Sequence, residues 1–182
     1  TPPPDPATLR KRITIKGYSF NGVPYRRKNY APEISLLAYC LMPNHFHLLT
    51  KQVSKNSIEK FMRSLATRYV IYFNRRHHRL GPLFQDTYKA VTIDEESYLL
   101  HLTAYIHRNP HQIWTHPLQD YPYSSYAEYL QLRSTSWVKS QEILALFRSP
   151  RNTSPADYLS YENFVTSPPD NSQIFLENIT ID

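Results

Sequence analysis

The chain has 182 residues, of which 41% are hydrophobic, and a formal net charge of +6 at pH 7. This length suits one domain with an appendage. No apolar run approaches the roughly 18 residues of a membrane span, so we expect neither a transmembrane helix nor a signal peptide. The single cysteine, Cys40, excludes an internal disulfide and fits a reducing compartment such as the cytoplasm.

The positive charge is concentrated in two stretches. Residues 1–30 hold seven Lys and Arg against one acid, and residues 51–90 hold nine against two. Many of the 15 tyrosines lie beside these basic residues. Cations bind phosphates and flat rings stack on unpaired bases, so the pattern favours a nucleic-acid surface and no membrane partner. A basic face that is only solvated is the alternative.

The N-terminal half of the chain predicts an arm and then a β-hairpin. Residues 1–33 are basic and Pro-containing, with at most one short strand at Arg12–Ile15. Strands are expected at Ile34–Leu41 and His45–Lys51, because Met42-Pro43-Asn44 between them is typical of a turn.

Two histidines begin the second of these strands. Side chains alternate faces along a strand, so His45 and His47 point the same way, roughly 6–7 Å apart. Two imidazoles on one face can converge on a divalent metal ion. Ordinary half-buried histidines of a β-hairpin are the alternative.

A helix is expected after Asn56, which with Glu59 forms a capping-box pattern. Its apolar residues recur every three to four positions and form a stripe: Ile58, Phe61, Met62, Leu65, Tyr69, Tyr72 and Phe73. Gly81-Pro82 ends it. The arginines near its C-terminus also have a structural explanation, since cations there are favoured by the helix dipole.

A strand at Tyr88–Ile93 and a second helix at Glu95–Asn109, capped by Asp94 and ended by Pro110, are expected next. The core stripe of this helix consists of Leu99, Leu102 and Ile106. The residues His101, Tyr105 and Asn109 repeat every four positions and share a neighbouring face.

The C-terminal part of the chain is less regular. A loop at 111–135 leads into a short helix, and Trp137–Phe147 is expected to be helical. From Ser149 the chain is rich in Pro and Ser, and residues 153–182 hold five acids and no base. We therefore expect an acidic, partly disordered tail with order around Tyr158–Val165.

Three segments together carry a resemblance: AYCLMPNHFHLL, YFNRRHHRLGPLFQ and YLLHLTAYIHRNP, with YPYSSYAEYL after them. In this order they resemble the HUH single-tyrosine transposases of bacterial insertion sequences, most closely the REP-associated tyrosine transposases. The resemblance covers about Ile34–Tyr129. It implies an α+β, ferredoxin-like (RRM-like) antiparallel sheet with helices on one face. The domain plan is then an arm at 1–33, a catalytic domain at 34–130, and a helical and irregular extension at 131–182.

The resemblance also implies roles for residues. It makes the protein a bacterial, nucleoid-associated enzyme that cuts and rejoins single-stranded DNA beside DNA hairpins. Tyr105 matches the nucleophile, His45 and His47 the metal ligands, and Asn109 the polar residue that completes the site. Mixed His and amide ligation suits Mn²⁺ and tolerates Mg²⁺. The residues expected to contact phosphates are Arg63, Arg68, Arg75, Arg76 and Lys89.

The chemistry agrees with these residue types. Attack by Tyr105 gives a 5′-phosphotyrosine and a free 3′-OH, so the bond energy is kept for rejoining. A tyrosine has a free pKa near 10, so a proton acceptor is needed, and His101 is a candidate. Each role has a structural alternative: packing for Tyr105, an exposed helix position for His101, and helix termination for Asn109.

One departure concerns the start of the chain. The family's domain opens with a strand and a helix before AYCLMPNH, which residues 1–33 do not clearly supply. Either the chain is a fragment, or Arg12–Ile15 is a poor first strand, and a missing strand would expose a sheet edge. The competing functions are a non-catalytic module that binds DNA or RNA hairpins and a His-metal hydrolase of small phosphoesters. A monomer and a homodimer are both compatible with the sequence.

Overall fold

The computed structural model describes residues 10–22, 28–148 and 160–167, and the chain divides into two units, Thr1–Tyr30 and Ala31–Asp182. The α+β class is confirmed by two antiparallel sheets and five α-helices in the described residues. Our expectations for the first prolines and for most of the acidic tail lie outside these residues. The division at residues 34–130 and 131–182 stays a prediction.

Unit 1 contains a β-hairpin. Strands β1 (Lys11–Ile15) and β2 (Tyr18–Gly22) pair antiparallel. Lys16 and Gly17 between them have φ of 49° and 86°. Two consecutive positive φ angles in a two-residue loop define a type I′ turn, which matches the right-handed twist of the strands. The strand at Arg12–Ile15 is thus confirmed, and the expectation of at most one strand in residues 1–33 is wrong, because β2 pairs with it.

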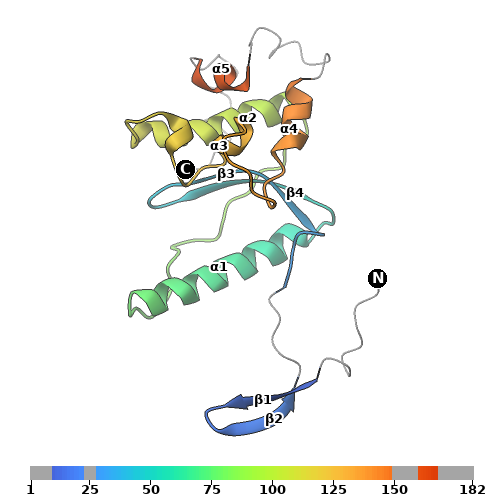
Figure 1. The fold of residues 1–182 in the computed structure, drawn as a ribbon, viewed down its shortest axis with the longest axis vertical. Helices are drawn as coiled ribbons and strands as arrows, with labels where there is room; N and C mark the ends of the chain where they lie inside the picture. The colour runs from blue at the N-terminus through green and yellow to red at the C-terminus, as the bar shows by residue number, and fades with distance from the viewer. Residues whose placement is uncertain (1–9, 23–27, 149–159, 168–182) are drawn as a thin grey trace. The chain divides into compact units, whose positions relative to one another are not determined.

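Unit 2 is built on a second β-hairpin, β3 (Ile34–Leu41) and β4 (Phe46–Gln52). β3 has the predicted bounds, and β4 is shifted by one residue from the prediction. The Met42 N–H donates to the His45 carbonyl at 2.9 Å, which closes the predicted turn. This ribbon is the central layer of the unit (Figure 1).

The edge of β3 that faces away from β4 is paired with later segments. Cys40 forms an antiparallel bridge with Ser124, and Leu36 a parallel one with Val138. The Leu41 N–H donates to the Tyr123 carbonyl at 2.8 Å. The exposed edge that a missing first strand would leave is therefore not found at β3, because the YPYSSY segment occupies it.

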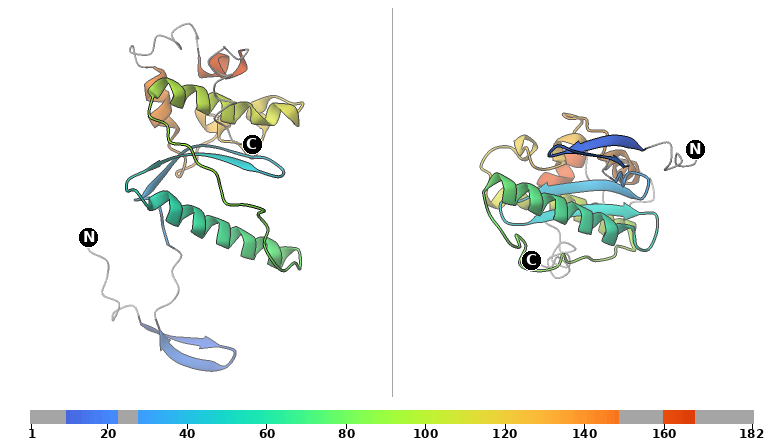
Figure 2. Two further views of the ribbon diagram at one scale, coloured as in Figure 1. Left: turned by 180° about the vertical axis from the view of Figure 1, so that it is seen from behind. Right: turned by 90° about the horizontal axis from the view of Figure 1, so that it is seen from below.

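Helices lie on both faces of the β3–β4 ribbon (Figures 1 and 2). α1 (Ser57–Arg76) covers one face, and α2 (Glu96–Arg108) and α4 (Ser140–Phe147) cover the other. α5 (Tyr161–Thr166) packs on α2. The expectation of helices on one face only is therefore wrong, and the ferredoxin-like strand order stays a prediction.

Short helices connect these layers. A 3₁₀ helix, η2 (Asn109–Gln112), follows α2 directly and contains Pro110, as the predicted helix end required. A second 3₁₀ helix, η3 (Leu118–Asp120), and the short α3 (Tyr126–Tyr129) form the loop and short helix that were expected in 111–135.

α1 differs from its prediction in two respects. Asn56 is the N-cap but makes no side-chain capping bond, and Gln52 Oε1 accepts the Ile58 N–H instead, at 3.2 Å. The predicted capping box is therefore wrong. Of the helix residues, only Ser57 and Met62 are buried. Most of the predicted apolar stripe is consequently half-exposed or exposed.

The segment before α2 is irregular. Residues 88–93 form no strand, so that prediction is wrong; no strand of the described residues pairs with this segment, which is exposed except for the half-buried Ile93. The N-cap of α2 is Glu95, without a side-chain bond, so the cap expected at Asp94 is also wrong. No helix in the described part of the chain has the length and apolarity needed to cross a bilayer.

The core lies between β3 and α2 and continues to α4 and α5. Its central side chains are buried on both faces of β3 and on the inner face of α2: Leu37, Ala38, Cys40, Leu100, Ala104 and Ile106. Of the predicted stripe on α2, Ile106 is buried, whereas Leu99 and Leu102 are half-buried at its margin. α2 is thus fixed against the ribbon that carries His45 and His47.

Candidate active site

Three candidate catalytic residues lie together where β4 begins and α2 ends. The rings of His45 and His47 have centroids 5.0 Å apart and meet edge to face. The ring of Tyr105 on α2 lies 5.8 Å from that of His47, again edge to face. Strand alternation brings the histidines to one face, and packing of α2 against β3 and β4 brings Tyr105 to them.

Asn44 orients the first histidine. Its Oδ1 lies 2.8 Å from His45 Nδ1. Because an amide oxygen only accepts hydrogen bonds, Nδ1 carries the proton and the Nε2 of the neutral ring holds the lone pair. From the sequence, Asn44 is predicted only as a turn residue. A polar residue directly before a candidate ligand was the available sign of this second role.

Asn109 lies one helical turn after Tyr105. Its side-chain Nδ2 donates to the Tyr105 carbonyl at 3.1 Å, so the amide closes the last turn of α2. This bond is the helix-terminating role considered for it. The bond uses the amide nitrogen and not the amide oxygen, so a ligand role for that oxygen stays a prediction.

The donor set fits a divalent metal ion. A metal-binding His typically donates its second ring N–H to an oxygen acceptor, as His45 does to Asn44. Two imidazoles and one amide oxygen suit Mn²⁺ and tolerate Mg²⁺. The described residues contain no group of three His, Cys, Asp or Glu that could hold a metal. An ion at this site would therefore depend on the amide and on groups from the substrate.

His101, the candidate proton acceptor, packs away from this cluster. It is buried, and its ring lies 5.3 Å from that of Phe164 on α5. These contacts favour a packing role for His101.

His107 belongs to the buried side of α2 and was missed by the sequence analysis. Its Nδ1 lies 2.9 Å from the Tyr161 hydroxyl, and its Nε2 lies 2.9 Å from Ser125 Oγ. Burial lowers the pKa of His107 from 6.5 to about 3, so the ring is neutral at pH 7. No local pattern indicates this network, because its members are far apart in the chain.

Arg108 attaches α5 to the end of α2. Its guanidinium donates to the carbonyls of Val165, Phe164 and Ser167, the last two at 2.7 and 2.9 Å. A cation at the carbonyl end of a helix is also favoured by the helix dipole. These bonds attach α5 and the residue after it to the end of the helix that carries Tyr105.

The predicted phosphate-binding residues are distributed along α1 and beyond it. Arg63 forms an exposed ion pair with Glu59 at 2.5 Å. Arg68 is half-buried, and Arg75 and Arg76 are exposed in the last turns of α1. Lys89 is exposed on the irregular segment after α1. Arg63 and Arg76 are roughly 20 Å apart along the helix, so these residues are distributed along and around it rather than gathered in one cluster; we call the five residues the basic strip.

A series of aromatic contacts leads from the histidine strand to this basic strip. Phe46, between the two histidines, contacts Phe84, and Phe84 contacts Tyr69 on α1, both at 6.2 Å between centroids. Tyr69 contacts Phe73 at 6.0 Å. Arg79 lies over the Phe73 ring at 5.7 Å. We call Phe46, Phe84, Tyr69 and Phe73 the aromatic ladder.

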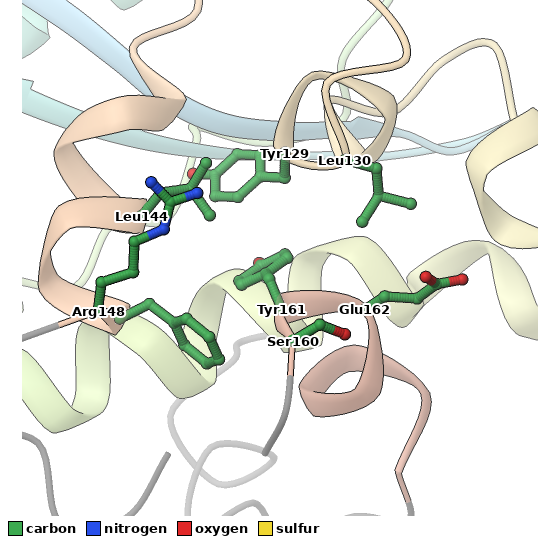
Figure 3. A pocket seen from close by; sticks show the side chains of 8 residues that line it. Tyr129, Leu130, Leu144, Arg148, Ser160, Tyr161 and Glu162 are labelled. Carbon is green, nitrogen blue, oxygen red and sulfur yellow. The ribbon is translucent and has the colours of Figure 1, made fainter. Parts of the chain in front are cut away.

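A cavity of about 300 Å³ opens elsewhere, between α3, α4 and α5 (Figure 3). Its lining is aromatic and apolar with one cation and one acid: Tyr129, Leu130, Leu144, Phe147, Arg148, Ser160, Tyr161 and Glu162. No candidate catalytic residue lines it, so the cavity is separate from the histidine and tyrosine cluster.

A paired-histidine strand facing a helix tyrosine defines a candidate phosphodiester-cleaving site. The family model described as "Transposase IS200 like" matches residues 25–109. This match supports the HUH single-tyrosine transposase superfamily for residues 25–109. The family indicates a transposase-type enzyme that acts on DNA. No curated protein and no solved structure matches the chain significantly.

Proposed function

We propose that the protein is a metal-dependent endonuclease and strand transferase that acts on single-stranded DNA beside DNA hairpins, in the manner of the REP-associated branch. The proximity of His45, His47 and Tyr105 is the observation that supports this proposal, with ring centroids 5.0 and 5.8 Å apart. This arrangement brings two imidazoles and one phenol into a single cluster. A cytoplasmic, nucleoid-associated location follows from such a substrate.

The cleavage step is a displacement at phosphorus. The Tyr105 oxygen bonds to the phosphorus, the bond to the 3′-oxygen breaks, and the 5′ side stays on the protein as a phosphotyrosine. The phenol loses a proton and the departing 3′-oxygen takes one up, so protons balance. Attack by a 3′-OH on the phosphotyrosine reverses these changes and rejoins a strand without ATP.

His45, His47 and the amide oxygen of Asn109 are the residues that would hold Mg²⁺ or Mn²⁺. When bound, the ion neutralises charge on the scissile phosphate. The second contribution is the positioning of the nucleophile. Packing of α2 against the β-hairpin holds Tyr105 relative to the imidazoles before DNA binds. Asn44 keeps His45 in the tautomer whose Nε2 can bind the ion.

The basic strip and the aromatic ladder suit the DNA. Arg63, Arg68, Arg75, Arg76 and Lys89 are the proposed phosphate contacts. The ladder begins at Phe46, which by strand alternation points to the face opposite the two histidines, so unpaired bases can stack along it on the α1 side of the ribbon. A small-phosphoester hydrolase would need neither surface.

The test is adduct formation with a labelled single-stranded oligonucleotide that contains a hairpin, analysed on a denaturing gel. Wild type with Mn²⁺ or Mg²⁺ should give a shifted, protease-sensitive band, and EDTA or Tyr105→Phe should abolish it. Tyr98→Phe, on the same helix, is the matched control and should retain the band. DNA binding without any adduct would instead identify a non-catalytic hairpin-binding module.

A further inference from the structure

The β1–β2 hairpin has a composition and a geometry that the proposed reaction does not use. Both strands end before residue 25, where the match to the transposase family begins. They belong to a unit of their own, Thr1–Tyr30. The described residues of that unit contain five basic residues and no acid: Arg10, Lys11, Arg12, Lys16 and Lys28. Such a charge balance favours a polyanionic partner.

The pairing register gives the hairpin two different faces. Arg12 lies opposite Asn21, and Thr14 lies opposite Ser19. Because alternate residues of a strand share a face, these four side chains form one polar face, and all four are exposed. Thr14 Oγ1 and Ser19 Oγ are 2.9 Å apart across the strands. We call this set the polar face of the hairpin.

Ile13 and Phe20 pair on the opposite face. A Cβ on Gly22 would lie 3.0 Å from the Phe20 ring and 3.4 Å from Ile13, so the ring lies against the Gly22 backbone. Together with the type I′ turn, this contact holds the two strands as a twisted ribbon that can present the polar face.

We propose that this β-hairpin is a second DNA site, which places its polar face in the major groove of duplex DNA. The major groove admits a two-stranded β-ribbon. Arg pairs with guanine, Asn with adenine, and Ser or Thr with either, which are the side chains of this face. Two cations at the ends of the first strand, Arg10 and Lys16, contact phosphates and set the register.

The inference rests on the proposed function in one respect: the duplex is the stem of the DNA hairpin beside which Tyr105 cuts. It adds a site that reads the paired part of the substrate, whereas the catalytic residues act on the unpaired part. An A-form RNA duplex has a deep, narrow major groove that side chains cannot enter, so it should not bind this face.

The test begins with the full chain and a library of randomised DNA duplexes, from which bound sequences are selected. Wild type should enrich a short motif, and affinity for the selected duplex is then measured by fluorescence anisotropy at several salt concentrations. Arg12→Ala with Asn21→Ala should lower that affinity on the order of tenfold or more and abolish the preference. Lys16→Gln, the control for charge loss, should reduce the salt slope by about one and keep the motif.

Two further measurements separate the possible failures. Arg12→Lys keeps the charge and should still lose the preference for its base pair. If Arg12→Lys selects the same motif as wild type, the polar face binds DNA only through charge, and the proposal is overturned. Adduct formation on a single strand without a stem should be unchanged in every hairpin variant. If wild type forms no adduct but selects a motif, the proposed function fails and the duplex site stands. Equal duplex RNA and DNA affinities overturn the duplex site alone.

Discussion

The imidazole of His107 on α2 lies 2.9 Å from the hydroxyl of Tyr161 on α5, although 54 residues separate them in the chain. Its other nitrogen reaches Ser125, whose backbone N–H donates to Tyr39 in β3. One buried ring therefore joins α2, α5 and the segment along β3. Tyr105 is two residues before His107, so this network also fixes the helix that carries the candidate nucleophile.

Removing the Tyr161 hydroxyl tests that network. Tyr161→Phe leaves a fully buried His107 nitrogen without its partner, and an unsatisfied buried group costs about 1–3 kcal/mol. We expect the free energy of unfolding, measured by urea denaturation, to fall by that amount. Tyr123→Phe removes the same hydroxyl from a side chain that is 58% exposed and should change stability little. Equal effects of both variants would contradict the network.

His107 also predicts how stability depends on pH. Burial lowers its pKa from 6.5 to about 3, so between these values the unfolded chain binds a proton that the folded chain does not. The contribution of His107 to the free energy of unfolding is therefore fully present above pH 6.5. It is lost as the pH falls toward 3, on the order of 1 kcal/mol per pH unit. Urea denaturation from pH 7.5 to 4.5 measures the slope. His107→Gln, which cannot titrate, should flatten it, and an unchanged slope would assign it to other groups.

The elements predicted correctly were those whose sequence pattern has one structural solution. β3 has the predicted bounds because a continuous apolar run between polar ends is buried on both faces. α2 ends at Arg108, one residue before the predicted end, because Pro110 cannot continue an α-helix. Residues 88–93 have suitable strand residues, but a strand also needs a neighbour, which a single segment does not reveal.

Part of the candidate site could be predicted from the sequence for a similar reason. Alternation along a strand predicted that His45 and His47 share a face, and helical spacing predicted that Tyr105 and Asn109 do. Only the resemblance joined the two pairs, since nothing local states that β4 and α2 are neighbours. The contacts of His107 and Arg108 with α5 depend on tertiary packing and therefore could not be read from the chain.

The half-buried ion pair between Glu128 and Arg133 should contribute more to the free energy of unfolding than the exposed pair between Lys51 and Glu142. Glu128 is buried and binds Arg133 through two bonds of 2.8 and 2.7 Å, and Arg133 also donates to backbone carbonyls. Arg133→Met removes the cationic partner of the Glu128 carboxylate, which keeps the Thr135 hydroxyl as a donor, so we expect a loss of about 3 kcal/mol. Lys51→Met breaks the exposed pair with Glu142 and should cost at most about 1 kcal/mol. Chemical denaturation of the two variants compares them, and similar losses would refute the difference.

Asn44 should tune metal binding without contacting the metal. Asn44→Ala removes the acceptor of the His45 N–H, and loss of such a partner typically weakens metal affinity roughly 10–100-fold. Titration with Mn²⁺, followed by calorimetry, measures this affinity. Asn44→Asp keeps an acceptor oxygen and should retain most of it. Wild-type affinity in Asn44→Ala would show that the bond does not orient a ligand.

The aromatic ladder should contribute to binding of unpaired DNA more than other exposed aromatic side chains do. Tyr69 and Phe84 contact each other and are 46% and 39% exposed, so a base can stack on them. Loss of one stacking ring typically costs about 1–3 kcal/mol, and Tyr69→Ala or Phe84→Ala should therefore weaken affinity for an unstructured oligonucleotide about fivefold or more. Tyr72→Ala removes a ring that is 63% exposed on the same helix but outside the ladder. Anisotropy titrations at one salt concentration compare the three variants, none of which changes the charge. If Tyr72→Ala weakens binding as much as the ladder variants, the bases follow a different path along α1.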